Sequence, residues 1–255
     1  MSLCIGLCVY GSEFGLPYVF KNIERIQTLF QEKIQVVVAY AESPDCSLGF
    51  LISKLPEFDI HILKNPNAKS NTKSTIHVEN IANARNQILE HIRSKFTDTK
   101  YLIMMDTNEY ACIGDIQLET LSEVLNPDKE KEWDAVSFDR EAGYYDYGAL
   151  SFDPFIYTND DLKPVEKMRE YVGNLLEKAK QTPNDFITVY SAFNGFAIYK
   201  WSVFQECNYS STDDCEHRHF HLQAIRDKNA RIRIYPKSLF SIFKGEKIKN
   251  CRGLC

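Results

Sequence analysis

The strongest constraint on the fold is an alternation, over residues 3–105, of short apolar runs with longer stretches of helical periodicity. The runs are short and rich in buried-type side chains, which is typical of strands covered on both faces. They are Leu3–Tyr10, Ile34–Tyr40, Phe58–Leu63 and Tyr101–Met105. Strands that alternate with helices imply parallel βαβ units. The sequence therefore predicts an α/β fold with a doubly wound, mostly parallel central sheet flanked by helices.

The remaining pattern predicts helices and strands through the whole chain. We expect helices over Leu16–Phe30, Leu48–Leu55, Val78–Phe96, Asp115–Leu125 and Asp160–Lys180. Further strands are expected over Trp133–Phe138, Phe193–Tyr199 and Ala230–Tyr235, and residues 65–75 are polar and predict a mobile loop. No repeat and no Gly/Ser linker divides the chain, so we expect a single domain over residues 1–255.

Composition excludes several classes of protein. The net charge of −5 and the absence of a basic stripe argue against a nucleic-acid partner. The first apolar run is far shorter than the ~20 residues of a spanning helix, and no basic residue precedes it as in a signal peptide. We therefore expect no transmembrane segment and a cytoplasmic location. The eight cysteines are expected to be free thiols.

Polar residues follow the predicted strands at the edge where ligands bind in doubly wound sheets. Asp106 and Asn108 come directly after the apolar run 101–105, and such hard oxygen donors suit Mg²⁺ or Mn²⁺. An ordinary strand end followed by a helix cap is the alternative. Arg85 lies inside the predicted helix 78–96 and could pair with a diphosphate. A solvated arginine on the outer face is equally compatible with the pattern.

Two segments of the second half carry further candidates. Residues 213–221 hold three histidines at alternate positions, so His217 could complete an oxygen-rich metal shell. A helix start with surface histidines is the alternative there. Residues 144–147 combine tyrosine rings with Asp146, which suits a carbohydrate site because rings stack on the apolar faces of sugars. An aromatic loop packed on the core has about equal weight.

In this order, the segments resemble the GT-A fold (Rossmann-like) glycosyltransferases. The chain is most similar to the fungal capsule-associated mannosyltransferases and their microbial and viral relatives. The matching segments are Ser43–Ser47 (an S-x-D-x-T turn), Ile81–Asn86 (I-A-x-x-R-N), Tyr101–Asn108 (a strand leading into DxD), Tyr145–Leu150 (Y-D-x-W-A-L), Phe193–Gly195 (F-N-G) and Cys215–His217 (C-E-H). The chain departs from the pattern at Asn108, which replaces a carboxylate, and at Gly148, which replaces an aromatic residue.

The resemblance implies a nucleotide-binding half over residues 1–110 and an acceptor and sugar half over residues 111–255. It also implies a nucleoside diphosphate sugar donor, a glycan or other hydroxyl acceptor, and Mn²⁺ or Mg²⁺. A viral relative would work in the host cytoplasm. The implied positions are Asp45 at the base or ribose, Arg85 at the diphosphate or donor sugar, Asp106 and Asn108 at the DxD, and Asp146, Asn194 and Glu216 at the sugar and acceptor.

The expected reaction is metal-assisted transfer of a hexose to a hydroxyl group. If the enzyme inverts, a carboxylate must take the proton of the acceptor, with Glu216 as the first candidate and Asp146 as the second. A retaining enzyme needs no such base. Two alternatives stay open, a non-catalytic nucleotide-sugar-binding protein derived from a transferase and a nucleotidyltransferase. The second is weaker because Gly11–Gly15 contains no Lys or Arg for a pyrophosphate.

Overall fold

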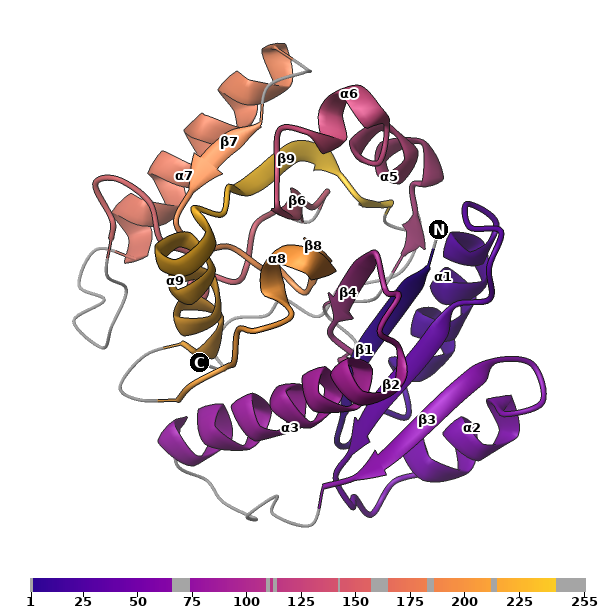
Figure 1. Ribbon diagram of the computed structural model, residues 1–255. Helices are drawn as coiled ribbons and strands as arrows, with labels where there is room; N and C mark the ends of the chain where they lie inside the picture. The colour runs from indigo at the N-terminus through magenta and orange to yellow at the C-terminus, as the bar shows by residue number, and fades with distance from the viewer. Residues whose placement is uncertain are drawn as a thin grey trace.

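One eight-stranded sheet organises the chain (Figure 1). The computed structural model describes residues 2–65, 74–108, 111, 114–141, 143–156, 165–182, 186–211 and 215–241. In sheet order the strands are β3 (Asp59–Lys64), β2 (Gln35–Tyr40), β1 (Leu3–Val9), β4 (Tyr101–Met105), β8 (Phe196–Lys200), β6 (Ala135–Asp139), β9 (Ile232–Ser238) and β7 (Ile187–Val189). A short second sheet pairs β5 (Asp115–Ile116) with β10 (Phe240–Ser241).

Most strands of the large sheet run in one direction. β1, β2, β3 and β4 pair in parallel, and so do β6 and β9. β8 is antiparallel to both β4 and β6, and β7 is antiparallel to β9. The prediction of a mostly parallel sheet is therefore confirmed. The helix–strand alternation predicted neither the strand β7 nor the reversed direction of β8.

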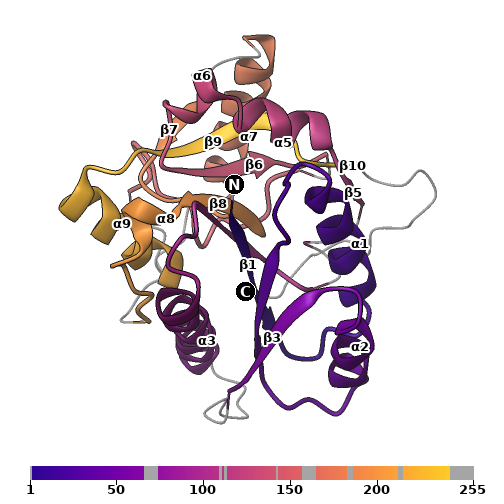
Figure 2. The same cartoon turned by 45° about the vertical axis from the view of Figure 1, so that its right-hand side comes forward.

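Helices cover both faces of the sheet (Figures 1 and 2). Alternate residues of each strand point to opposite faces, so Leu102 and Met104 belong to one buried cluster and Ile103 and Met105 to the other. The first face packs against α3 (Ser74–Lys95), α7 (Val165–Gln181), α8 (Trp201–Phe204) and α9 (Glu216–Lys228). The second packs against α1 (Leu16–Gln27), α2 (Ser47–Lys54) and α5 (Leu118–Val124), and α6 (Pro127–Glu130) follows α5 along the chain.

Two predicted elements need correction. The helix expected over Asp115–Leu125 begins only at Leu118, because Asp115–Ile116 forms β5. Asn22 of α1 holds this backbone in place through hydrogen bonds to the Gly114 carbonyl and from the Ile116 N–H. These tertiary contacts outweigh the local helical pattern.

The strand expected over Phe193–Tyr199 begins at Phe196. The preceding residues turn the chain, with positive φ angles of 57° at Asn194 and 81° at Gly195. Asparagine and glycine are the residues that most readily adopt this left-handed conformation. The F-N-G segment is therefore a turn at the start of β8.

Several predictions fall on residues that the structure does not describe. The expected loop over 65–75 lies mostly outside the described residues, as do residues 213 and 214 of the histidine-rich segment. The described cysteines, Cys4, Cys8, Cys46, Cys207 and Cys215, are free thiols, as expected. Within the described ranges, no helix is both long and apolar enough to cross a membrane.

The carboxyl ends of β1 and β4 are tied together by short polar contacts. Thr107 donates its hydroxyl to the Cys8 carbonyl at 2.8 Å, and its Oγ1 lies 2.8 Å from Oγ of Ser12. Gly15, which precedes α1, packs directly against the Thr107 backbone, so that a Cβ at this position would lie 2.0 Å from the Thr107 carbonyl oxygen. The absence of a side chain at Gly15 thus permits the close approach of α1 to the end of β4.

We expect Gly15→Ala to destabilise the fold by about 1–3 kcal/mol, the usual cost of overpacking against a backbone that cannot move aside. Urea unfolding measures the difference. Gly49→Ala is the matched control, because Gly49 lies in α2 with nothing within 4 Å of the position that a Cβ would take, and this variant should gain up to about 1 kcal/mol of helix stability. Equal stabilities of the two variants would contradict the prediction.

Candidate active site

Arg85 lies at the centre of the candidate site, with only 6% of its side chain exposed. It projects from α3, and its Nη1 donates to Oε1 of Glu216 at the first residue of α9. Its Nη2 lies 3.4 Å from Oδ1 of Asp106, which directly follows β4. The ion pairs thus join two helices and a strand end. Burial lowers the pKa of Arg85, but the charge of Glu216 outweighs this effect and raises it above its usual value.

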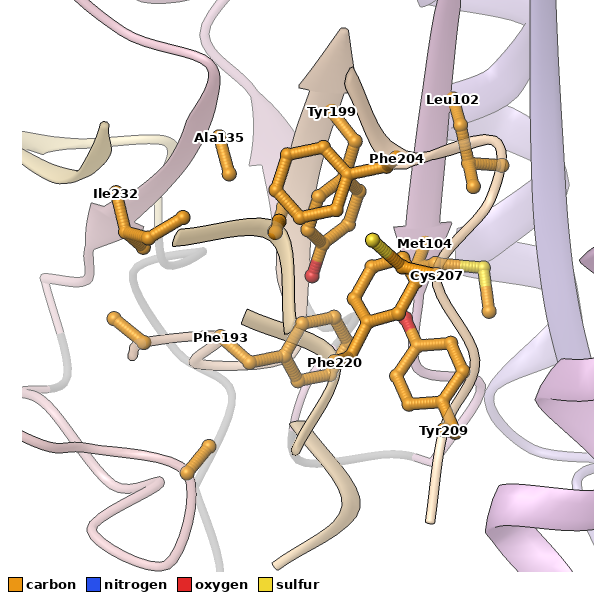
Figure 3. Close-up of a cluster of buried hydrophobic side chains, with 14 of the residues drawn as sticks. Leu102, Met104, Ala135, Phe193, Tyr199, Phe204, Cys207, Tyr209, Phe220 and Ile232 are labelled. Atoms are coloured by element: carbon orange, nitrogen blue, oxygen red, sulfur yellow. The ribbon is translucent and has the colours of Figure 1, made fainter. Parts of the chain in front are cut away.

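Aromatic rings surround the buried guanidinium group of Arg85. Its Cζ lies 4.9 Å from the ring centroid of Phe193 and 5.4 Å from that of Tyr209. Tyr209 stacks on Phe220 of α9 with centroids 4.2 Å apart and planes inclined by 10° (Figure 3). Because the ring faces carry negative partial charge, they stabilise the cation and restrict its movement. Arg85 is therefore held in one position rather than solvated on the outer face of α3.

Asp106 is fixed by contacts from two other segments. Its backbone N–H donates to the Gly195 carbonyl at 2.9 Å, and Tyr145 donates its hydroxyl to Oδ2 of Asp106 at 3.2 Å. A Cβ at Gly195 would lie 2.4 Å from the Tyr145 hydroxyl oxygen, so the glycine leaves the space that this ring needs. The Asp106 side chain remains 26% exposed. The carboxylate is thus anchored at one side and open at the other.

Asp146 and Asn194 bind each other's backbones. Oδ1 of Asn194 accepts from the Tyr145 and Asp146 N–H groups at 3.1 and 3.4 Å, while the Asn194 N–H donates to Oδ2 of Asp146 at 3.2 Å. Nδ2 of Asn194 donates to the Phe138 carbonyl at 2.9 Å, and Oδ1 of Asp146 accepts from the Ala149 N–H at 3.1 Å. Asn194 is 2% exposed. Its contacts hold the loop after residue 143 against the turn before β8.

Carboxylates outnumber guanidinium groups in this cluster. Burial, and then the charges of Asp106 and Glu216, raise the pKa of Asp146 to about 6, although the Ala149 N–H and Arg85 oppose the shift. Burial likewise raises the pKa of Asp106, with Arg85 and Tyr145 opposing it. Arg140, the residue after β6, contributes a second positive charge near Asp106. The site therefore carries excess negative charge when its acids are ionised, and it favours an added cation.

Asp45 lies at another part of the sheet edge, in the loop between β2 and α2. Its carboxylate accepts from the Glu13 N–H at 3.0 Å and from the hydroxyl groups of Ser43 and Ser47 at 2.6 and 2.8 Å. Burial raises its pKa, but these hydrogen bonds outweigh that effect and lower it. Glu13 in turn accepts from the Cys46 N–H. Asp45 thus joins the loops that follow β1 and β2, and its contact with a base or ribose stays a prediction.

The predicted metal ligands do not form a ready cluster. Oδ1 of Asn108 accepts from the Ala111 N–H at 2.8 Å. His217 is buried, and its ring stacks on Phe193 with centroids 3.9 Å apart. Burial and then the charge of Arg85 hold the pKa of His217 well below its usual value. No group of three or more His, Cys, Asp or Glu side chains suited to a metal occurs in the described ranges, which leave out Glu109.

The donor chemistry nevertheless fits a divalent cation at Asp106. Mg²⁺ and Mn²⁺ commonly use one or two protein oxygens together with phosphate and water. Asp106, partly exposed and in an acidic cluster, supplies such an oxygen, and Asn108 is a second oxygen donor nearby in the chain. His217 does not fit this set, because its ring packs between Phe193 and the edge of Tyr209. A metal held by Asp106 and Asn108 stays a prediction.

The structure brings together Arg85, Asp106, Asp146, Asn194 and Glu216, which the sequence had singled out separately. It adds Arg140 and Tyr209, which the sequence did not single out, and it gives Tyr145, one of the rings of residues 144–147, a hydrogen bond to Asp106. The position of Tyr145 beside Asp146 in the Y-D motif was the pattern that could have indicated this role. No motif or spacing in the sequence marked Arg140 or Tyr209, since a strand-end arginine and an isolated tyrosine are common in any sequence.

We expect Glu216→Ala to lower the free energy of unfolding by up to about 3–5 kcal/mol, because the buried charge of Arg85 loses its closest partner and keeps only the 3.4 Å contact with Asp106. Urea unfolding measures the loss. Glu57→Ala breaks an exposed i,i+3 pair with Lys54 and should change stability by less than about 1 kcal/mol. Similar effects of the two substitutions would contradict a central role for the buried pair.

No protein-family model and no curated protein matches the sequence. Solved structures of S. aureus TarS 1-349 do match. The UDP complex gives a TM-score of 0.57 at 13% identity, covering 94% of this chain and 59% of that one. The UDP-GlcNAc complex gives a TM-score of 0.52 at 13% identity, covering 97% of this chain and 60% of that one. The structure without a named ligand gives a TM-score of 0.54 at 12% identity, covering 95% of this chain and 60% of that one.

The present chain thus spans about three fifths of the length of these structures. At such low identity the likeness concerns the arrangement of strands and helices. Together with the mostly parallel sheet covered on both faces, it shows that the chain has the GT-A fold.

Proposed function

We propose that the chain is a glycosyltransferase that moves a hexose from a nucleoside diphosphate sugar to a hydroxyl group of a glycan or another acceptor. The observation that carries the proposal is the cluster of Arg85, Asp106 and Glu216 at the carboxyl edge of a GT-A sheet. Ligands of open α/β sheets bind at this edge. TarS, which shares the fold, has been solved with UDP and with UDP-GlcNAc, which supports a nucleotide sugar as the donor.

The loops after β1 and β2 are the proposed site for the nucleotide. Tyr10 and Phe14 are 65% and 69% exposed, which is unusual for aromatic rings and leaves faces on which a base can stack. Asp45 and Glu13 hold these loops together through reciprocal contacts with backbone N–H groups. Asp45 would then act near the base or ribose mainly by shaping the loop that receives it.

Asp106 and Asn108 would hold the proposed Mg²⁺ or Mn²⁺, which neutralises the charge of a leaving diphosphate when bound. The protein's own contribution is to keep Asp106 in place through Arg85, Tyr145 and the Gly195 carbonyl. The excess of carboxylates makes this position attractive to a cation. Arg85 faces Glu216 and Asp106, so we assign it a positioning role, with contact to the diphosphate as a further part of the proposal.

If the reaction inverts, Asp146 suits the role of base better than Glu216. Oε1 of Glu216 is engaged by Nη1 of Arg85 in a buried ion pair, so this carboxylate is already occupied by a partner within the protein. Asp146 has a pKa raised to about 6, close to the range in which a general base works well near neutral pH. Glu216 then acts through Arg85, while Asn194 fixes the loop that carries Asp146.

The kinship with the fungal capsule-associated mannosyltransferase group belongs to this proposal. Its support is the order of the motifs, because I-A-x-x-R-N, the DxD-like segment, Y-D, F-N-G and C-E-H supply residues that meet in space. Such convergence of separate short matches is what a shared active site requires.

The proposal is tested by incubating the protein with UDP- and GDP-linked hexoses in the presence of Mn²⁺ and measuring release of the nucleoside diphosphate. We expect release with at least one donor, and we expect Tyr10→Ala to weaken UDP binding by about tenfold through loss of a stacking surface. Ile52→Ala, which removes an exposed side chain of α2, serves as the control. Binding of UDP without any release from any donor would favour the non-catalytic alternative.

A pH profile tests the base. We expect kcat/KM to rise with pH as Asp146 loses its proton, because it must be ionised before it can accept one. The pKa of about 6 belongs to the metal-free site, and a cation at Asp106 should move the inflection to lower pH, since the charge of Asp106 helps to raise the pKa of Asp146. Asp146→Asn should lower kcat by about 10²–10⁴-fold and remove this inflection. Glu216→Gln should keep an inflection but move it to lower pH, because the charge of Glu216 helps to raise the pKa of Asp146. Activity of Asp146→Asn within about tenfold of wild type would remove Asp146 from the role.

A further inference from the structure

A surface groove between α7 and β7 lies outside the cluster described above. Its volume is about 520 Å³, within the range of about 300–1,000 Å³ typical of small-ligand sites. Among its lining residues are Phe152, Asp153, Tyr171, Lys178, Thr188 and Tyr190. Neither the predicted chemistry nor the proposed nucleotide site uses these side chains.

The groove presents two exposed tyrosine rings. Tyr171 of α7 is 44% exposed and stacks on Phe152, with centroids 5.7 Å apart and planes inclined by 26°. Phe155 packs against the edge of the same ring at 5.7 Å. Tyr190, just after β7, is 37% exposed. Exposed rings that neighbours hold rigidly offer flat apolar faces at little cost in side-chain entropy, which suits the C–H faces of sugars.

Polar groups lie beside these rings. Tyr190 donates its hydroxyl to Oδ2 of Asp153 at 2.9 Å, which fixes the orientation of the ring. Lys178 and Thr188, which carry an ammonium group and a hydroxyl group, are also among the lining residues. The opposite charges of Asp153 and Lys178 leave the groove without a strong bias for an ion. Mixed aromatic and hydrogen-bonding walls of low net charge fit a neutral, polyhydroxylated ligand better than a phosphate or a purely apolar partner.

Two short chain segments connect the groove with the candidate active site. Ser151 and Ser191 pair through hydrogen bonds of 2.9 and 3.2 Å, and the Tyr190 N–H donates to the Ser151 carbonyl at 2.7 Å. The chain runs from this pair to Asp146 in one segment and to Asn194 in the other. Asp153 follows Asp146 closely enough that a fully extended chain would separate their Cα atoms by no more than about 25 Å. An oligosaccharide can span such a distance.

We propose that this groove is a remote subsite that binds the carbohydrate chain of the acceptor, with Tyr171 and Tyr190 as stacking platforms. The proposal rests on the proposed glycosyltransferase function, which it deepens by making the acceptor an oligosaccharide. The subsite holds sugar units distant from the reacting hydroxyl group. Its contribution is to affinity for long acceptors and not to the transfer step.

The test uses saturation-transfer NMR on the whole chain with chitohexaose, maltohexaose and α-1,6-mannohexaose as probes. We expect saturation transfer to at least one hexasaccharide, and a loss of affinity of about tenfold in Tyr171→Ala and in Tyr190→Ala. Tyr190→Phe keeps the ring and should lose less. Ile52→Ala, on the opposite side of the sheet, is the control and should bind as wild type does.

Steady-state kinetics distinguish a failure of the proposed subsite from a failure of the proposed glycosyltransferase function. With a donor that supports turnover, the two alanine variants should raise KM for the hexasaccharide while leaving kcat and the release of nucleoside diphosphate without acceptor unchanged. An unchanged affinity for every probe in both variants, or binding of none of them by wild type, would overturn the subsite. Binding of a hexasaccharide that depends on Tyr171 and Tyr190, together with inactivity toward all donors, would keep the subsite and overturn the proposed function.

Discussion

The buried ion pair between Arg85 and Glu216 is the interaction on which the site depends. A guanidinium group cannot shed its charge, so its burial among Phe193 and Tyr209 requires an opposing carboxylate. Glu216 supplies that charge from the first turn of α9. Each helix therefore restricts where the other can lie, and Asp106 at the end of β4 is placed by the same cation. The same placement of α3, α9 and the end of β4 thus packs rings around Arg85 and pairs its charge.

A second constraint joins the halves of the chain. β8 runs antiparallel to β4, which brings the Gly195 carbonyl to the Asp106 N–H. Asn194 lies in the turn before β8 with a positive φ angle, and its side chain accepts a hydrogen bond from the Tyr145 N–H. This contact holds the loop of Tyr145 against the turn. Because β8 runs antiparallel to β4, its first residues lie beside the carboxyl end of β4. Residues of the second half of the chain are thereby placed next to Asp106.

The sequence predicted the sheet well because its evidence is local: short apolar runs, helical periodicity and polar strand ends. It also singled out Arg85, Asp106, Asp146, Asn194 and Glu216, largely through a resemblance in ordered motifs. It failed where distant contacts decide the outcome. Asn22 keeps β5 extended against a helical pattern. No local pattern could show that Tyr209 would stack over Phe220 beside Arg85, because these residues meet only in the folded chain.

The balance of charge connects the whole chain with its site. The sequence is acidic, and a protein of this kind can bind a diphosphate only if positive charge is concentrated locally. Arg85 alone does not meet this need, because Glu216 and Asp106 already face it. Arg140 adds a second positive charge near Asp106. The pKa values of Asp106 and Asp146 are nevertheless raised, first by burial and then by neighbouring carboxylates, so the site still disfavours further negative charge. A diphosphate would therefore bind here more readily with a cation, so the acidity that disfavours nucleic acid is compatible with a metal-assisted nucleotide site.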